Sequence, residues 1–266
     1  MQRRDFLTAA TAAGFAAVAP ASVLPTAKAD DAASARRYIL LETYFTQSAE
    51  KRDALVAKFD AILIPERNKL GFDKVGVFTP NADLNKGERG LEPFANAVFV
   101  VSEAATLDAL TTLQDRSVAE GSNAFNATDD LDFVDQEISA LLAFPTQPQI
   151  TVPFNNEERV LQLRVYNSPN FERNFAKEKM FDVRGELDLF RRCGMAPVFF
   201  GRTLFGSMAP NISYMLSFPN DKARREGWDK FVKSAEWKEM SGEAEFARTA
   251  TRIRNIFLKP SPKSQI

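Results

Sequence analysis

The same order of predicted elements occurs twice along this chain, and this repeat constrains the fold more than any other feature of the sequence. In its first occurrence, an apolar strand at 37–45 precedes a helix at 49–64, which we expect Pro65 to break. In its second, the strictly alternating strand 158–166 precedes a helix at 170–192. A chain with this pattern is expected to fold as two similar units.

Both occurrences continue with two strands, a second helix and a closing segment. In the first half these are predicted at 75–78, 96–102, 104–118 and 131–139. In the second half they are predicted at 198–201, 211–217, 221–234 and 248–258. The closing segment of the first half also fits a helix, because its apolar residues recur at helical spacing. Each half therefore predicts a β-α-β-β-α-β order, the ferredoxin-like arrangement with helices on one face of the sheet.

A proline-rich segment at 144–156 separates the two halves and suits a linker. We therefore expect an α+β protein with two tandem ferredoxin-like units, the first at 36–143 and the second at 157–266. A chain of this length is sufficient to bury a core in each unit.

The first 29 residues have the three parts of an export signal. Arg3 and Arg4 form the charged start, an apolar stretch rich in alanine follows at 6–24, and Ala29 ends a small-residue cleavage site. The adjacent arginines resemble the twin-arginine pattern, whose pathway carries folded proteins. An uncleaved membrane anchor is the competing interpretation, but the stretch is too weakly apolar for a span of about 20 residues. We expect the mature protein to begin near Asp30 and to act in the periplasm.

The chain contains no histidine and a single cysteine, Cys193. These absences exclude a Ser-His-Asp triad, a histidine-ligated zinc or haem, a four-cysteine iron–sulfur cluster and an intramolecular disulfide. We therefore expect no metal site and assign no cofactor. Any catalysis has to use carboxylates, Lys, Arg, Tyr or a bound organic cofactor. Basic residues flank Cys193 and could activate its thiol, but we favour a structural thiol at a helix end.

The charge balance disfavours nucleic acid as a partner. Removal of Arg3, Arg4 and Lys28 together with Asp5 lowers the net charge from −1 to −3, which gives a mildly acidic surface. No later segment approaches the length and apolarity of a spanning helix, so we expect no stable membrane insertion once the signal is removed.

Several motifs of the second half resemble those of the NIPSNAP family. The matching segments are 163–166 (Leu-Arg-Val-Tyr), 185–192, 197–201, 210–216, the pair Trp228 and Trp237, and the tail 258–266. The first half diverges, since Glu42 stands where the pattern has a basic residue. The resemblance implies a dimeric α/β barrel, in which two ferredoxin-like units face each other across their sheets, here within one chain. That superfamily includes haem enzymes, cofactor-free monooxygenases and small binding proteins, and NIPSNAP members have no settled reaction.

Alternation sorts the residues of the opening strands into two faces. We expect the apolar face to pack under the helices and the polar face to point into the space between the units or into solvent. On the second opening strand, the apolar set is Leu161, Leu163 and Val165, and the other set is Gln162, Arg164 and Tyr166. Glu42 and Tyr44 take the same places in the first half. If an approximate two-fold axis relates the halves, Glu42 and Arg164 form a charge pair across the lumen; two separately solvated charges are the alternative.

Glu186 is a candidate carboxylate on the helix at 170–192. That helix is predicted to bury one apolar side, made of Phe171, Phe175, Val183, Leu187 and Phe190. Glu186 lies at the edge of this side, where partial desolvation would raise its pKa and suit it to act as a general base. We favour the competing interpretation, a buried ion pair with Arg202 or Arg164.

Two functions from different classes fit this sequence. One is a binding module, in which the space between the halves or a sheet edge holds a small apolar or aromatic molecule, a second protein or another copy of this chain. The other is a histidine-free, metal-independent, monooxygenase-like enzyme for a small apolar or aromatic substrate, with Glu186, Tyr166 and Arg164 as candidate catalytic residues. The predicted ligand-binding residues are Glu42, Tyr44, Arg164, Tyr166, Glu186, Arg202 and Tyr214. We favour binding, and we expect Trp228 and Trp237 to pack in the core.

Overall fold

The structure, a computed structural model, describes residues 36–266 apart from 89 and 120–131. The predicted export signal at 1–29 lies outside these described residues. Of the helices that are described, none combines the length and the apolarity that a membrane crossing requires.

The β-α-β-β-α-β order predicted for each half is confirmed. The strands of the first half are β1 (Tyr38–Phe45), β2 (Val75–Pro80), β3 (Ala97–Ala104) and β4 (Asp135–Ala143). Its helices are α1 (Ala49–Lys58), a π-helical turn η1 (Phe59–Leu63), α2 (Ile64–Lys69), a 3-10 turn η2 (Glu92–Phe94) and α3 (Leu107–Ala119). The strands of the second half are β5 (Val160–Asn167), β6 (Ala196–Gly206), β7 (Asn211–Phe218) and β8 (Arg252–Pro260). Its helices are α4 (Phe171–Asp182), α5 (Glu186–Arg192), α6 (Asp221–Lys233), α7 (Ala235–Gly242) and a 3-10 turn η3 (Ala244–Phe246).

Polar residues set where several helices begin. Ser48, Asn170, Asn220 and Ser234 immediately precede α1, α4, α6 and α7, and each side chain accepts a hydrogen bond from a backbone N–H of the first turn. Such a cap satisfies an N–H group that the helix leaves without a partner, and it contributes about 1 kcal/mol.

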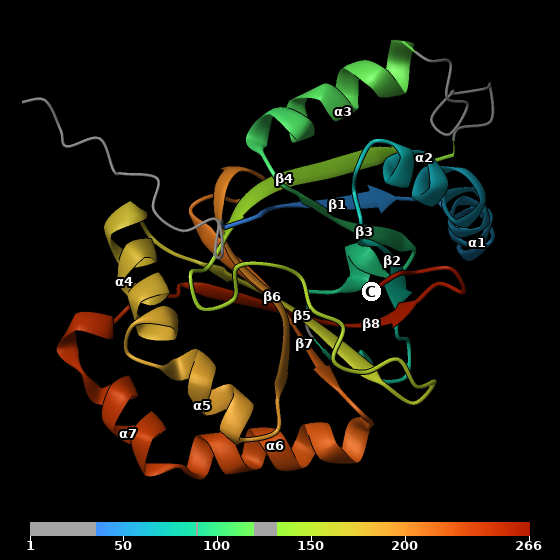
Figure 1. Ribbon diagram of the computed structural model, residues 1–266. Coiled ribbons are helices and arrows are strands. Elements are labelled where there is room, and N and C mark those ends of the chain that lie inside the picture. The colour runs from blue at the N-terminus through green and yellow to red at the C-terminus, as the bar shows by residue number, and fades with distance from the viewer. Residues whose placement is uncertain (1–35, 89, 120–131) are drawn as a thin grey trace, which may run out of the picture. The chain divides into compact units, whose positions relative to one another are not determined.

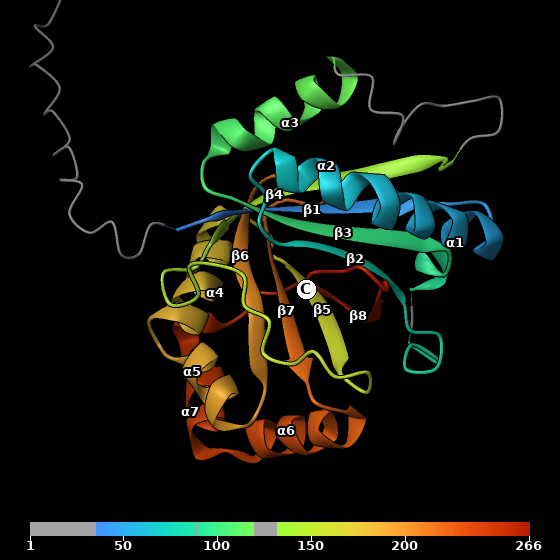
Figure 2. The same ribbon diagram turned by 45° about the vertical axis from the view of Figure 1, so that its right-hand side comes forward.

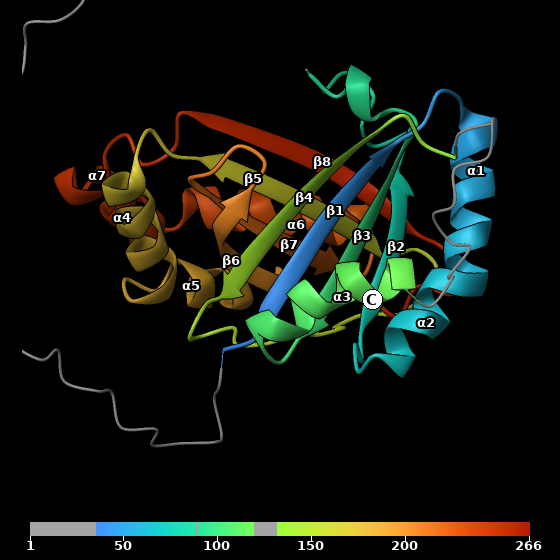
Figure 3. The same cartoon turned by 90° about the horizontal axis from the view of Figure 1, so that it is seen from above.

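The strands form a closed antiparallel barrel. The first half contributes the order β4-β1-β3-β2 and the second half the order β8-β5-β7-β6. The halves meet where β2 pairs with β8 and where β4 pairs with β6. Figures 1 and 2 show the strands of the first half lying above those of the second, and Figure 3 shows the two sets crossing. This is the dimeric α/β-barrel arrangement, with both units in one chain.

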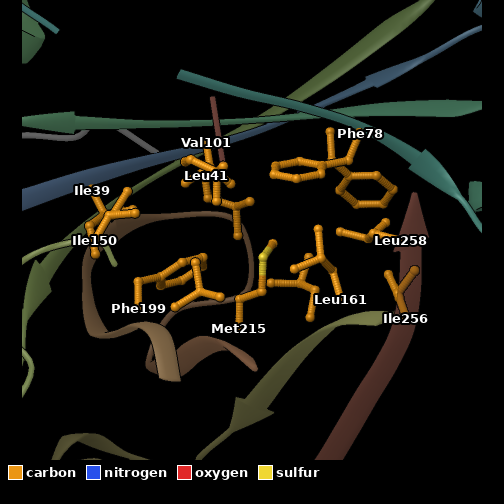
Figure 4. Packing of buried hydrophobic residues seen from close by; sticks show 14 of the residues in the cluster. Ile39, Leu41, Phe78, Val101, Ile150, Leu161, Phe199, Met215, Ile256 and Leu258 are labelled. Atoms are coloured by element: carbon orange, nitrogen blue, oxygen red, sulfur yellow. The ribbon is translucent and has the colours of Figure 1, made fainter. Parts of the chain in front are cut away.

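Apolar side chains from all these strands fill the barrel. Leu41 and Val101 of the first half point toward Leu161 and Met215 of the second (Figure 4). Full burial of an aliphatic or aromatic side chain contributes about 1.5–3 kcal/mol, so this shared cluster is a strong source of cohesion between the halves.

Helices cover the outside of each half. α1, α2 and α3 lie over the first sheet, and α4 to α7 lie over the second (Figures 1 and 2). A second apolar layer lies between helices and sheet in each half, around Phe59 and Phe72 in the first and around Phe181, Phe190 and Phe200 in the second. Cys193 ends α5 and is buried in this layer, where burial raises the pKa of its thiol, as fits a structural role.

The prediction that Pro65 breaks the first helix is wrong. Pro65 lies in the first turn of α2, and helical structure continues to Lys69. The π-helical turn before it accounts for this, because the N–H of Ile64 there donates to the carbonyl of Phe59, five residues back. The wider turn accommodates a residue that has no N–H of its own.

The helix predicted at 170–192 is divided, and its buried side was predicted incorrectly. Gly185, with φ +93°, separates α4 from α5. Leu187 and Phe190 are buried on α5 as predicted, but Phe171, Phe175 and Val183 are exposed. α4 instead buries Asn174, Lys177, Met180 and Phe181. Because the break changes the direction of the chain, one helical stripe does not continue across it.

The ends of the two halves also contribute to the barrel. The closing segment of the first half is the strand β4, which removes the helix alternative. Ile150, in the segment predicted as a linker, and Ile266, the last residue, both join the apolar cluster inside the barrel. The barrel is therefore filled partly by segments outside its strands.

Candidate functional site

The predicted site residues lie under the helices, outside the barrel. Leu161 and Leu163 face the interior of the barrel, whereas Tyr166 packs in the layer beneath α4 and α5. Tyr44 packs in the matching layer of the first half. The prediction that the apolar face packs under the helices, while Arg164, Tyr166, Glu42 and Tyr44 point into the space between the halves or into solvent, is therefore wrong. Alternation correctly separates the two faces, but both faces are covered, so it does not show which one faces the lumen.

The proposed charge pair between Glu42 and Arg164 across the lumen is also wrong. Glu42 instead forms an ion pair of 2.5 Å with Arg67 of α2, and both side chains are about 5% exposed. The hydroxyl of Tyr44 donates to Glu42 at 2.8 Å, and Arg67 donates to the hydroxyl of Ser102 at 2.7 Å. Burial opposes the charge of Arg67, but Glu42 outweighs that effect and the pKa of the guanidinium is raised. The charges of Glu42 and Arg67 therefore offset each other within the first half.

Glu186 takes part in a buried ion pair, as favoured, but with a different partner. Lys177 of α4 donates to its carboxylate at 2.8 Å, and Glu186 is 2% exposed. Arg202 lies outside this cluster, because it pairs with Glu178 at 2.8 Å. Burial raises the pKa of Glu186, while Lys177 and Arg164 oppose that shift.

Two tyrosines extend the cluster along the sheet. Tyr166 of β5 and Tyr214 of β7 lie on neighbouring strands, and the hydroxyl of Tyr214 donates to that of Tyr166 at 3.0 Å. Their ring centroids are 5.3 Å apart in an edge-on arrangement. Burial raises the pKa of Tyr214 well above its ordinary value, so this residue stays protonated at neutral pH.

Arg164 is the cation of this cluster that has no direct counter-ion. Its guanidinium carbon lies 4.5 Å from the ring centroid of Trp228 and 5.2 Å from that of Tyr166. With the residues that the structure describes it makes no hydrogen bond and no ion pair, and its Nε is buried without an acceptor. Burial opposes its charge, but the combined effect of Tyr214, Tyr166, Glu186 and Glu88 raises its pKa and keeps it protonated.

One of the two cations in the buried cluster lacks a carboxylate in direct contact among the described residues. Lys177 is paired with Glu186, whereas Arg164 interacts with Glu186 and Glu88 only at longer range. Uncompensated charge in a partly desolvated layer costs free energy, which a bound anion would relieve. Arg164 and its aromatic neighbours therefore form a candidate site for an anionic group.

Sequence reasoning missed two members of this site. Lys177 was overlooked because the predicted apolar stripe of α4 placed it on the solvent side. Trp228 and Trp237 do pack against the core cluster, as predicted, but Trp228 also stacks on Arg164 and donates through its indole N–H to Gln162 at 2.8 Å. The spacing of Glu186 nine positions after Lys177 is not a helical contact, so only the break at Gly185 brings them together.

Other features of the surface do not coincide with this cluster. A groove of about 790 Å³ runs between the loop at 81–84, the segment 152–160 and the tail 259–266, and it contains none of the predicted site residues. Within the described part of the chain, no group of three or more Cys, Asp and Glu residues is placed to hold a metal ion.

Comparison with known proteins supports the family and the fold. The NIPSNAP family model matches residues 158–265. No curated protein has a sequence that matches this chain. Among solved structures, a candidate monooxygenase of Lactobacillus acidophilus NCFM is 9% identical, with a TM-score of 0.57 over 87% of this chain and 98% of that chain.

Two further structures share the fold. A candidate monooxygenase of Fusobacterium nucleatum is 7% identical, with a TM-score of 0.52 over 85% of this chain and 93% of that one. An anthrone oxidase-like protein is 9% identical, with a TM-score of 0.50 and the same coverage of 85% and 93%. At these identities the likeness concerns the fold alone. Residues 158–265 are thus similar to the NIPSNAP family, and the two halves together have the dimeric α/β-barrel fold.

Proposed function

We propose that this protein is an exported binding protein that holds a small aromatic anion at Arg164. The observation that carries the proposal is the Arg164 guanidinium, which is stacked on Trp228 and has no acceptor or carboxylate in contact with it among the described residues. A carboxylate is the natural partner, because its two oxygens match the parallel N–H donors of a guanidinium. The rings of Trp228 and Tyr166 would contact the aromatic part of the ligand.

The proposal moves the binding site from the space between the halves to the helix-covered face of the second half. Arg164, Tyr166, Glu186 and Tyr214 come together there, whereas Glu42 and Tyr44 form a separate group. Lys177 and Glu186 pair with each other in the same cluster, so the ligand charge would be met by Arg164.

Fluorescence of Trp228 tests the proposal directly. The chain has two tryptophans, so Trp237→Phe leaves Trp228 as the sole reporter. In this background, para-nitrobenzoate should quench the fluorescence saturably, whereas the neutral para-nitrobenzamide should quench only by collision. Arg164→Gln should weaken the saturable quenching about tenfold, as expected for loss of a charge-assisted hydrogen bond. Arg225→Gln, which removes an exposed cation of α6, serves as the matched control and should change nothing.

Equal quenching by the two probes would refute the proposal, as would an Arg164→Gln protein that binds para-nitrobenzoate as tightly as its parent. Native mass spectrometry of protein purified from its own periplasm extends the test. The expected result is an aromatic acid bound in stoichiometric amount.

The part of the proposal that concerns export rests on the sequence of residues 1–29. We expect the N-terminal residue of the protein recovered from the periplasm to be Asp30 and the double change Arg3→Lys, Arg4→Lys to hold the precursor inside the cell. Recovery of an intact N-terminus from the cytoplasm alone would overturn this part of the proposal.

A second candidate function is monooxygenase-like oxidation of a small aromatic substrate. It is favoured by the buried carboxyl of Glu186, whose raised pKa lies in the direction that a general base needs. The ion pair with Lys177 opposes that role, which is why binding is preferred. Oxygen uptake with anthrone as the probe tests this function. Glu186→Gln and Tyr166→Phe should each reduce the uptake. Uptake that survives both substitutions would show that these residues do not take part in the reaction.

A further inference from the structure

The interior of the barrel changes along its axis from apolar to mixed apolar and polar. Near the start of β1 the lumen is filled by residues such as Ile39 and Phe199 (Figure 4). Near the end of β1, polar residues of both halves join apolar ones such as Leu41, Leu163 and Ile256 in the lining. The polar residues are Thr43, Glu137 and Ser139 from the first half and Asn211, Ser213 and Arg254 from the second.

These residues surround a chamber of about 30 Å³. A buried water needs about 10–15 Å³ by this measure, so the chamber has room for roughly two water-sized groups. An organic ring does not fit in this volume, whereas a halide or an anion of two or three atoms does.

Arg254 supplies a cation that is poorly compensated. Glu137, which is 32% exposed, lies 3.8 Å from its guanidinium, longer than a hydrogen bond. Among the described residues its other polar contact is to the sulfur of Met208 at 3.1 Å, a weak acceptor, and its Nε is buried without a hydrogen-bond partner there. Its guanidinium carbon also lies 4.5 Å from the ring centroid of Phe94. Burial lowers the pKa of Arg254, Arg252 adds to that shift, and Glu137 opposes it.

Hydroxyl donors face the same chamber. Thr43 is 5% exposed and makes no side-chain hydrogen bond with any described residue. The Ser139 hydroxyl accepts from the backbone N–H of Ser207 at 3.1 Å, which leaves its own proton available. The side-chain amide oxygen of Asn211 already accepts from the hydroxyls of Thr203 and Ser213, so those two protons are engaged.

The turn that closes the chamber is held in an unusual conformation. Met208 has φ +59°, a left-handed conformation that costs a non-glycine residue about 1 kcal/mol or more. The side-chain amide of Asn167 holds it by donating to its carbonyl at 2.8 Å. This conformation accompanies the contact of the Met208 sulfur with Arg254.

We propose that this mouth of the barrel binds one small monovalent anion, of the size of chloride, bromide or nitrite, on Arg254, with Thr43 and Ser139 as hydroxyl donors. The site is distinct from Arg164, which lies on the outer face of the sheet.

Thermal unfolding in sodium bromide or sodium nitrite tests the proposal, with sodium gluconate holding the ionic strength constant. A ligand that binds the folded state raises the midpoint with the logarithm of its concentration, whereas gluconate is too large for the chamber. The wild-type midpoint should rise with bromide and nitrite. Arg254→Met should weaken the apparent affinity about tenfold, in line with loss of a charged partner.

Thr43→Val keeps the size of the side chain and is the variant least able to disturb folding; its apparent affinity should fall about threefold. The exposed Arg225→Gln should respond like the wild type. Bromide-soaked crystals should give an anomalous peak beside Arg254 that is lost in Arg254→Met. The proposal is overturned if the wild-type midpoint does not depend on bromide or nitrite, or if Thr43→Val and Arg254→Met respond like the wild type.

Discussion

The two halves of this protein place charged side chains in the same layer, between the sheet and its helices, but they compensate the charge differently. In the first half the carboxylate lies on the strand, as Glu42, and the cation lies on the helix, as Arg67. In the second half the cation lies on the strand, as Arg164, and the carboxylate of Glu186 on the helix is paired with Lys177.

This difference separates a structural ion pair from the anion-binding group that we propose. In the first half the charges of Glu42 and Arg67 offset each other, and Tyr44 and Ser102 hydrogen bond to the pair. In the second half Arg164 contacts rings instead of a carboxylate. On the proposed function, an equivalent position on a repeated scaffold acquires a ligand when its local counter-ion is taken by a neighbour.

The largest expected effect comes from breaking the ion pair between Glu42 and Arg67. Glu42→Gln leaves Arg67 buried without a counter-charge, so the free energy of unfolding should fall by about 3–5 kcal/mol. Urea denaturation at neutral pH measures it. Lys69→Gln, an exposed cation on the same helix, is the control and should change the free energy by less than about 0.5 kcal/mol. A loss from Glu42→Gln no larger than that of the control would contradict the account of this pair.

The second expected effect is the pH dependence of stability that comes from Glu186 in the second half. Because burial raises the pKa of Glu186 in the folded state, the folded protein binds a proton more readily than the unfolded chain. The stability that Glu186 contributes is therefore fully present below its pKa in the unfolded chain, and it declines as the pH rises through its pKa in the folded protein. The wild type should lose stability relative to Glu186→Gln as pH rises from about 4, by about 1.4 kcal/mol for each unit by which the pKa is raised. Urea denaturation of both proteins at a series of pH values checks the slope, and a wild type that gains stability relative to Glu186→Gln as pH rises would show the opposite shift.

A smaller effect concerns the helix break that brings Lys177 to Glu186. Gly185→Ala places a side chain at φ +93°, with nothing within 4 Å of the added Cβ, so the cost is conformational and about 1–2 kcal/mol. Gly242→Ala, at the end of α7, also meets open space and should be neutral or slightly stabilising. Thermal unfolding compares the two variants. Equal midpoints would show that the break does not depend on glycine.

The smallest effect concerns the outer side of α4. Phe171 is 53% exposed, so Phe171→Ser should change the free energy of unfolding by about 0.5 kcal/mol or less. Phe181→Ala, on the buried side of the same helix, should cost about 3–5 kcal/mol. Comparable losses in urea denaturation would mean that both sides of α4 are packed.

Much of the fold could be predicted from the sequence, because its signals are local. The alternation of 158–166 and the repeated element order correctly predict β5 and the β-α-β-β-α-β arrangement. The effect of Pro65 could not be predicted, because a π-helical turn depends on how one helix is accommodated on the sheet. The buried side of α4 was missed because the break at Gly185 shifts the register of the helical pattern.

The residues of the site were easier to predict than their positions. Arg164, Tyr166, Glu186 and Tyr214 do come together, but beneath the helices. In a closed barrel both faces of the sheet are covered, so polarity does not indicate which face lies inside. Lys177 has no sequence signal as the partner of Glu186, since their contact depends on the tertiary packing of α4 against α5.

The most direct test compares two arginines, one from each half, by urea denaturation. Arg67→Met should lower the free energy of unfolding by about 3–5 kcal/mol, because it leaves Glu42 buried and unpaired. Arg164→Met should change it by about 1 kcal/mol or less, because no carboxylate loses its partner and the stacking on Trp228 is kept in part. A loss from Arg164→Met as large as that from Arg67→Met would contradict the claim that Arg164 is a cation held for a ligand.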